Sequence, residues 1–283
     1  MSKALVIIKS MGIGDLSILI SSIHAISKKI ARPVTVLAQK NTRAHTILKH
    51  DPHIEEVIEL DEKEIKSFFS IIRKIKPKRF DQSYIYSDSI RLYLISKLSG
   101  IKENFHYKFF SKKGKNFFKT AKEFTEKTLN TEINPQSKIY CNNNDIVEAK
   151  TKYNISKEYK NIVLAPSASG DDKVWFIDRF IATCEKLNKV KPCKFYIAAG
   201  KNDKHLIDKI INSPIGKNCI SFENLTIGET LPIIKNCDGF LGGDTGFLHI
   251  SCALGLKCVA IFFNSPVKSY GTYSKYYLCD SRR

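Results

Sequence analysis

The chain has 283 residues, of which 43% are hydrophobic and 11% aromatic, so it can bury a sizeable core in one large or two ordinary domains. No apolar stretch approaches the roughly 20 residues of a membrane span, and the N-terminal run Ala4 to Ile8 is too short for a signal peptide, so we expect a cytoplasmic protein. The net charge of +18 predicts an acidic partner: nucleic acid, an anionic membrane surface or acidic small substrates, although an AT-rich genome would also enrich lysine.

The eight cysteines are scattered without a CxxC pair, and we expect them to be free thiols. His45, His50 and His53 cluster loosely, and a solvated surface explains them better than a metal site. No metal is therefore predicted.

Apolar extended runs alternate with helical patterns through the first half of the sequence. The predicted strands are Ala4–Lys9, Val34–Ala38, Val57–Leu60 and Gln82–Tyr86, and the predicted helices are 15–29, 42–50, 63–76 and 88–98. Alternation at this spacing is typical of parallel βαβ units.

A basic, aromatic stretch interrupts the alternation at 102–122, with seven lysines, one glutamate and six aromatic residues. It is either a solvated surface helix with an apolar underside or a flap that meets an acidic, partly apolar acceptor or a membrane surface. The polar segment 141–160 follows, and we place a domain boundary there, which gives domains of residues 1–150 and 151–283.

The alternation then resumes, so the fold class is α/β with two halves of similar plan. The predicted strands are Ile162–Ala165, Phe195–Ala199, Cys219–Phe222, Phe240–Leu241 and Cys258–Phe262, and the predicted helices are 175–189, 203–212, 227–236 and 246–255. The tetrapeptide TIGE at 226–229 has the spacing of a capping box. Ligands of such folds bind at the carboxyl ends of the strands.

Three loops at such strand ends carry candidate chemistry. The first, after the first strand, contains Gly12 and Gly14 but has Ser17 where a dinucleotide fingerprint has its third glycine. Asp15 opens the following helix. It is either a first-turn acid that stabilises the helix by about 1 kcal/mol or, in a cleft, a general base.

The second loop is LAPSASGDDKVWF, 164–176. Ser167, Ser169, the Gly170 backbone and Lys173 make a plausible phosphate cradle, and Trp175 is expected to pack its helix against the sheet.

The third loop is GGDTGFLHISCALG, 242–255, where a buried strand turns into a helix rich in small and apolar residues. Its backbone N–H groups and the positive end of the helix dipole suit a phosphate. The carboxylate of Asp244 in such a place therefore needs a separate role.

Taken together, the motifs resemble glycosyltransferase family 9, the lipopolysaccharide heptosyltransferases. The matching elements are Gly14-Asp15, Lys173-Val-Trp175 and Asp244-Thr-Gly-Phe-Leu-His249, in that order, within residues 3–263. The resemblance implies a GT-B architecture of two Rossmann-like domains that face each other across a cleft. The acceptor would bind to the first domain and the nucleotide-sugar to the second.

The resemblance also implies an inverting transfer without metal or other cofactor, from a nucleotide-sugar such as ADP-heptose to a lipopolysaccharide-type or other anionic glycolipid. Peripheral contact with the cytoplasmic face of the membrane would accompany such an acceptor, and no specific nucleic acid is expected. Ser21 and Phe176 stand where the family usually has prolines.

By the same resemblance, Asp15 deprotonates the acceptor hydroxyl, and Lys173 offsets the charge on the departing diphosphate. The N–H groups of Thr245 and Gly246 hold a phosphate, Asp244 binds sugar hydroxyls, and Asp203 holds the ribose. His249 either faces this site or is a core histidine. The predicted donor-binding residues are Ser167, Ser169, Lys173, Asp203, Asp244, Thr245, Gly246 and His249, and the predicted acceptor-binding residues are Gly14, Arg91, Lys112 and Lys113.

Three other functions remain open from the sequence. A catalytically degenerate relative would bind a nucleotide-sugar without transferring it. A basic nucleic-acid-binding protein would use the charge, although no zinc-finger, RNP-like or helix-turn-helix pattern is present. A nicotinamide-dependent dehydrogenase would use the first glycine turn, but the missing third glycine and the lack of an acid after the second strand disfavour it.

Overall fold

The computed structural model describes residues 2–9, 12–107, 116–168, 170–263 and 276–280. Its contacts divide the chain into two compact units, with the first running to Tyr140 and the second beginning at Cys141. Residues 141–150 thus group with the second unit, although they were predicted to belong to the first domain. They do so because helix α7 (Asn143–Lys152) packs on α10 (Ile227–Lys235), where the Asn236 side-chain amide donates to the Ile146 carbonyl at 2.8 Å.

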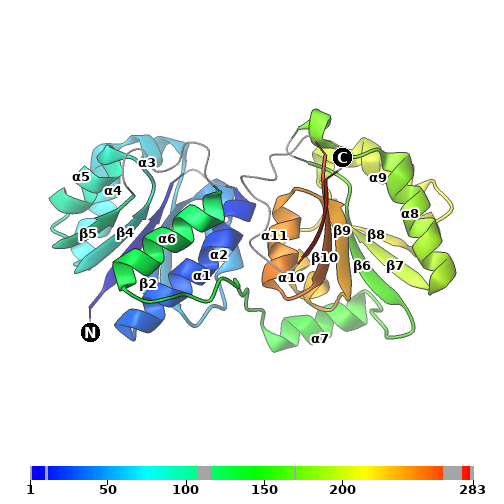
Figure 1. Ribbon diagram of the computed structural model, residues 1–283, viewed down its shortest axis with the longest axis horizontal. Coiled ribbons are helices and arrows are strands. Elements are labelled where there is room, and N and C mark those ends of the chain that lie inside the picture. Colours follow the sequence, from blue (N-terminus) through cyan, green and yellow to red (C-terminus); the bar gives the residue numbers. More distant parts are fainter. Residues whose placement is uncertain (1, 10–11, 108–115, 169, 264–275, 281–283) are drawn as a thin grey trace. The chain divides into compact units, whose positions relative to one another are not determined.

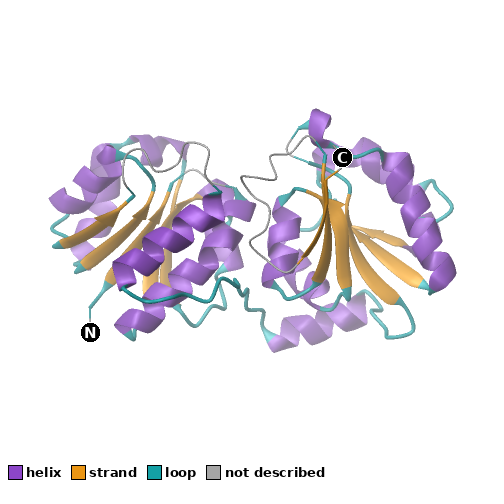
Figure 2. Cartoon of the chain, in the orientation of Figure 1, coloured by secondary structure: helices purple, strands orange, loops and turns teal. Residues whose placement is uncertain are grey.

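The first unit is a parallel sheet in the order β3-β2-β1-β4-β5, with helices on both faces (Figures 1 and 2). Its strands are β1 (Ala4–Ile8), β2 (Val34–Gln39), β3 (Ile54–Leu60), β4 (Gln82–Tyr86) and β5 (Glu103–His106). Its helices are α1 (Ile13–Ile30), α2 (Ala44–Ile47), α3 (Glu62–Lys66), α4 (Phe68–Ile75), α5 (Ile90–Leu98) and α6 (Phe117–Leu129). The four predicted strands are confirmed.

The helix predicted over 63–76 is two helices, because the backbone extends at Ser67 between them. Asp61 begins α3 by accepting the N–H groups of Lys63 and Glu64. At Ser67 the backbone N–H donates to the last carbonyls of α3, and the side-chain Oγ accepts the N–H of Ser70 and so begins α4. Side chains that cap a new helix favour such a break within a continuous amphipathic pattern.

The basic stretch 102–122 is not one helix. Glu103–His106 forms the edge strand β5, with the Phe105 ring 5.0 Å from the Tyr84 ring of β4, and α6 begins at Phe117. A strand was missed here because lysine and aromatic residues satisfy both patterns in a short run. The centre of the predicted flap lies outside the described residues.

The second unit is a parallel sheet in the order β11-β10-β9-β6-β7-β8. Its strands are β6 (Lys160–Ala165), β7 (Cys193–Ile197), β8 (Cys219–Ser221), β9 (Gly239–Gly243), β10 (Lys257–Phe262) and β11 (Tyr276–Asp280). Its remaining helices are α8 (Ile177–Val190), α9 (Lys204–Ile211) and α11 (Gly246–Ala253). This strand order is the doubly wound order of dinucleotide-binding domains. The five predicted strands are confirmed, and β11 was not predicted.

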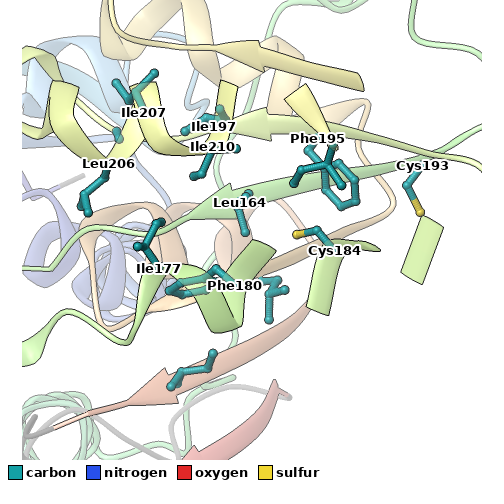
Figure 3. Packing of buried hydrophobic residues seen from close by; sticks show 14 residues of the cluster. Leu164, Ile177, Phe180, Cys184, Cys193, Phe195, Ile197, Leu206, Ile207 and Ile210 are labelled. Atoms are coloured by element: carbon teal, nitrogen blue, oxygen red, sulfur yellow. The ribbon is translucent and has the colours of Figure 1, made fainter. Parts of the chain in front are cut away.

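The core between this sheet and helices α8 and α9 is apolar and closely packed (Figure 3). Phe180 of α8 and Phe195 of β7 are fully buried in it. The capping box predicted at 226–229 is present at the start of α10, where Glu229 accepts the Thr226 N–H at 2.8 Å and Thr226 accepts the Glu229 N–H.

All eight cysteines are free thiols, and burial raises the pKa of the Cys184 and Cys219 thiols to about 12. These two side chains are therefore neutral at pH 7 and act as small apolar residues. In the part of the chain that the structure describes, none of the helices has the length and apolar character needed to cross a bilayer.

Candidate active site

In each unit, the strands that follow the first strand are added on one side of it, and the later strands are added on its other side, so the strand order reverses at the first strand. In the first unit β1 is followed by β2 and β3 on one side, and β4 and β5 lie on the other. In the second unit β6 is followed by β7 and β8 on one side, and β9 to β11 lie on the other. The loops after the two central strands diverge at such a reversal, and ligands of open α/β sheets bind there.

Asp15 lies at the reversal point of the first unit, in the first turn of α1. Its carboxylate accepts the backbone N–H of Gly12 at 3.0 Å, so it closes the first turn of the helix. The first-turn acid of our sequence analysis is thus present. A carboxylate has two oxygens and can accept several hydrogen bonds, so the contact with Gly12 is compatible with a second role.

The preceding loop needs no special glycine conformation at Gly12, whose φ of −81° and ψ of −174° suit any residue. A Cβ atom added there would meet nothing within 4 Å. Gly14 follows in the first turn of α1. The glycine pattern of this loop therefore does not indicate a close backbone approach at Gly12.

Arg91 lies at the other side of the same reversal point, in the first turn of α5. Its guanidinium donates to the carbonyls of Lys66, at 2.7 Å, and of Ile65, both in the last turn of α3. Two of its N–H groups therefore cap α3. The other predicted acceptor-binding residues, Lys112 and Lys113, lie outside the described residues.

In the second unit, β6 and β9 pair directly and bring two of the predicted loops side by side. A Cβ atom on Gly242 would lie 2.6 Å from the Ala165 carbonyl oxygen and 2.7 Å from the Ala165 Cβ, and one on Gly243 would lie 3.2 Å from the Ser167 carbonyl oxygen. These two glycines therefore let β9 approach the end of β6. The strand was predicted to end at Leu241, before a phosphate-binding glycine turn, whereas both glycines belong to β9.

The N-terminus of α11 opens at this junction. Thr245 is the N-cap residue, yet its side chain makes no cap hydrogen bond, and its Oγ1 is buried without a hydrogen-bond partner among the described residues. Gly246 is the first residue of the helix. The first turn of a helix has N–H groups without helical partners and carries the positive end of the dipole, so a hydroxyl and several N–H groups meet here.

The Thr245 hydroxyl adds a donor that was not predicted, since only the N–H of this residue was assigned to the phosphate site. A threonine before a helix normally accepts a cap hydrogen bond, so nothing in the sequence distinguishes this one. An unpartnered buried hydroxyl is costly to a protein and calls for an explanation, which a bound anion would supply.

The side chain of Asp244 lies beside that of His249, which is one turn into α11. Its Oδ1 lies 3.6 Å from the Nε2 of His249, and both side chains are largely buried. The structure therefore joins two residues of the third motif, Asp244 and His249, as a pair. His249 is itself only 5% exposed, so it is part of the packed surface of the helix.

Lys173 ends a short 3-10 helix, Asp171–Lys173, in the loop after β6, and its N–H donates to the Gly170 carbonyl at 3.0 Å. Trp175 contacts the core, with its ring edge-on to Phe180 at 4.8 Å between centroids. The packing role predicted for Trp175 is confirmed. Ser167 belongs to the same loop, and Ser169 lies outside the described residues.

Asp203 lies after β7, the strand next to β6. Its carboxylate accepts the Gly200 N–H at 3.3 Å and so caps the 3-10 helix Lys201–Asp203. An acid after the second strand is where doubly wound domains hold a ribose. The described residues contain no group of three or more His, Cys, Asp or Glu side chains that could hold a metal ion.

Comparison with known proteins decides the family. The model of glycosyltransferase family 9 (heptosyltransferase) matches residues 107–281, which is more than half of the chain. The chain belongs to glycosyltransferase family 9. As a member of this family it is a glycosyltransferase, and the resemblance seen in the sequence motifs is confirmed.

Among characterised relatives, lipopolysaccharide heptosyltransferase 1 of Campylobacter coli is 21% identical over 269 residues, which cover 84% of this chain and 78% of that protein. The Escherichia coli ADP-heptose lipopolysaccharide heptosyltransferase II has the same fold as this family 9 member, with a TM-score of 0.78, 17% identity, and coverage of 98% of this chain and 90% of the other.

A family 9 protein of Veillonella parvula matches with a TM-score of 0.83, 14% identity and coverage of 99% and 86%. The Escherichia coli heptosyltransferase WaaC with ADP matches with a TM-score of 0.74, 13% identity and coverage of 98% and 92%. These similarities confirm the predicted fold of two parallel-sheet α/β domains.

Proposed function

We propose that this family 9 glycosyltransferase moves a heptose, or a related sugar, from an ADP-sugar to a lipopolysaccharide-type or other anionic surface-glycan acceptor. The observation that carries the proposal is the N-terminus of α11, at the β6/β9 reversal point. There the buried Thr245 hydroxyl, which has no hydrogen-bond partner within the described ranges, meets the N–H groups of the first helical turn. That group of donors suits a diphosphate. The heptosyltransferase relatives, one of them with bound ADP, support an ADP-sugar.

The second unit would bind the donor. The N–H groups of Thr245 and Gly246 and the Thr245 hydroxyl would hold the diphosphate, with Ser167, Ser169 and Lys173 from the neighbouring loop. Asp203 would accept hydrogen bonds from the ribose, and Asp244, held by its contact with His249, from the sugar hydroxyls. Lys173 would oppose the negative charge that grows on the diphosphate as it leaves.

The first unit would bind the acceptor, with Gly14, Arg91, Lys112 and Lys113 near its acidic groups. The acceptor hydroxyl would attack the anomeric carbon of the sugar as its proton passes to the carboxylate of Asp15. The bond from the anomeric carbon to the diphosphate would break in the same step, and ADP would leave with the bonding electrons. A single displacement inverts the anomeric centre, and with Lys173 and the helix N-terminus on the diphosphate it requires no metal.

Binding is tested first, by thermal unfolding of the purified chain with ADP, ADP-heptose, a UDP-sugar and NAD. A ligand at 100 times its dissociation constant should stabilise the folded state by about 2.7 kcal/mol, and we expect this for ADP and ADP-heptose but not for the other two. Stabilisation by the UDP-sugar alone would contradict the assignment of the nucleotide. Binding of ADP-heptose without any transfer would identify the degenerate relative instead.

A further inference from the structure

Helix α5 is apolar on both of its faces, which is unusual for a helix on the outside of a sheet. Leu92 and Ile95 are fully buried in the core of the first unit. On the opposite face, Ile90, Leu94 and Leu98 follow one another at four-residue spacing and are 52%, 45% and 59% exposed. Residues at this spacing share one face of a helix, so their side chains form a continuous apolar row.

The neighbouring helix α4 extends this surface. Phe69 of α4 is 75% exposed. Helices α4 and α5 contact each other and lie side by side in Figure 1. We call Phe69, Ile90, Leu94 and Leu98 the apolar stripe. Exposed apolar side chains gathered in this way mark an interaction surface.

The segments that carry the apolar stripe are strongly basic, although Asp81, Asp88 and Glu103 border them. Residues 65–80 and 89–102 contain nine lysine and arginine residues and no aspartate or glutamate. They are Lys66, Arg73, Lys74, Lys76, Lys78, Arg79, Arg91, Lys97 and Lys102.

Some of these charges are already used within the unit. Lys74 and Lys78 pair with Glu64 and Glu56 of neighbouring elements, at 2.6 and 2.7 Å. Arg73 and Lys97 are exposed and belong to α4 and α5 themselves. Lys97 lies one helical turn from Leu94, with its ammonium 5.4 Å from the centre of the Tyr93 ring. A lysine in this position can lay its stem on an apolar surface and its charge beside an anion.

The charge decides which partner fits. A second copy of the chain would bring the same basic segments together, on a protein whose net charge is already +18, so self-association is disfavoured. Apolar side chains edged by lysine and arginine suit the interface of a bilayer that contains anionic lipids. There the side chains enter the headgroup region, and each basic residue adds electrostatic attraction.

We propose that the apolar stripe and the basic residues beside it dock this protein on an anionic lipid bilayer. This adds a partner to the proposed function and depends on neither the donor nor the acceptor named there. A glycosyltransferase that lies on the membrane in this way would act on acceptors anchored in the same surface.

The test is co-sedimentation of the full chain with vesicles of phosphatidylcholine and of a phosphatidylcholine–phosphatidylglycerol mixture, without any substrate. We expect binding to the anionic vesicles that falls at high salt, and weak binding to the neutral ones. The Leu94→Gln/Leu98→Gln variant should lose about tenfold or more in vesicle partitioning, because two apolar side chains no longer enter the interface.

Val190→Gln is the matched control, since Val190 is 88% exposed on α8 of the second unit and lies outside the stripe. It should bind as the unmodified chain does. Arg73→Gln/Lys97→Gln removes charge and keeps the stripe, and it should weaken binding to the anionic vesicles by about fivefold per residue at low salt. All these positions are exposed on helices, so circular dichroism should show folded variants.

Two results would overturn the proposal. The first is vesicle binding that is equal in Leu94→Gln/Leu98→Gln and Val190→Gln. The second is a concentration-dependent dimer, in the absence of vesicles, that Leu94→Gln/Leu98→Gln abolishes, since the stripe would then join two copies. Transfer to a detergent-dispersed acceptor reports on the proposed function alone, so failure of one proposal is distinguishable from failure of the other.

Discussion

Thr245 offers a substitution whose effects on stability and on ligand binding should have opposite signs. Replacing a threonine N-cap usually costs about 0.5–2 kcal/mol, because a cap hydrogen bond is lost. Here the side chain makes no such bond, and its buried Oγ1 has no partner in the described part of the chain. Thr245→Val keeps the shape of the side chain and replaces only the hydroxyl with a methyl group.

The free energy of unfolding of Thr245→Val should therefore be unchanged or higher, by up to the roughly 1–3 kcal/mol that an unsatisfied buried hydroxyl costs. Binding should weaken, since a hydrogen bond to a charged group contributes about 1.5–3 kcal/mol, which corresponds to about 10- to 150-fold in the dissociation constant. Urea unfolding measures the first quantity, and titration calorimetry with ADP measures the second.

Ser251→Ala is the matched control. Ser251 is fully buried on the same helix, and its Oγ also has no partner among the described residues, but it lies in the second turn of α11. Its removal should also spare stability, and it should leave ADP affinity unchanged. Loss of stability in Thr245→Val together with unchanged ADP affinity would show that the hydroxyl caps the helix, and the reasoning would be refuted.

Two further substitutions test the packing and the electrostatics. Gly242→Ala places a Cβ 2.6 Å from the Ala165 carbonyl oxygen, so it should lower the free energy of unfolding by about 1–3 kcal/mol and weaken ADP binding. The control Gly200→Ala, with nothing within 4 Å of its added Cβ, should change neither quantity. Equal stabilities of the two variants in urea would contradict the close approach of β9 to β6. Burial and the adjacent His24 lower the pKa of His53 below its usual value, although Asp51 opposes this. Because the unfolded chain then binds the proton more readily, stability should fall as the pH drops from about 7 to 5, and His53→Gln should reduce that fall in urea titrations; an unchanged pH profile would contradict it.

The strands and the order of the loops could be predicted from the sequence because parallel βαβ units have a strong, regular pattern. Ala4–Ile8 and Ile162–Ala165 are apolar runs flanked by turns and helices, and each lies in the first strand of its unit. Of the four edge strands, β3 and β8 were predicted, whereas β5 and β11 were missed. The strand β5, Glu103–His106, is short and lacks the continuous apolar pattern of a buried strand.

The details of the site depend on contacts between residues far apart in the chain, and those could not be predicted. Gly242 is needed because Ala165 lies against it, although the two are 77 positions apart. Two further facts are likewise tertiary. The Thr245 hydroxyl has no hydrogen-bond partner among the residues that the structure describes, and N–H groups of Arg91 already bind carbonyls of α3. Local motifs identified the loops, and only packing shows what their side chains already contact.

The most direct test of the account is the initial rate of sugar transfer from ADP-heptose to a detergent-dispersed lipopolysaccharide-core acceptor, for the unmodified chain and for Asp15→Asn. The amide oxygen of asparagine can still accept the Gly12 N–H that Asp15 now accepts at 3.0 Å, so thermal stability should be retained. It cannot take up the proton of the acceptor hydroxyl, and the rate should fall by about 10²- to 10⁴-fold. A transfer rate within twofold of the unmodified chain's would show that Asp15 only caps α1, and the proposed reaction would have to begin at another residue.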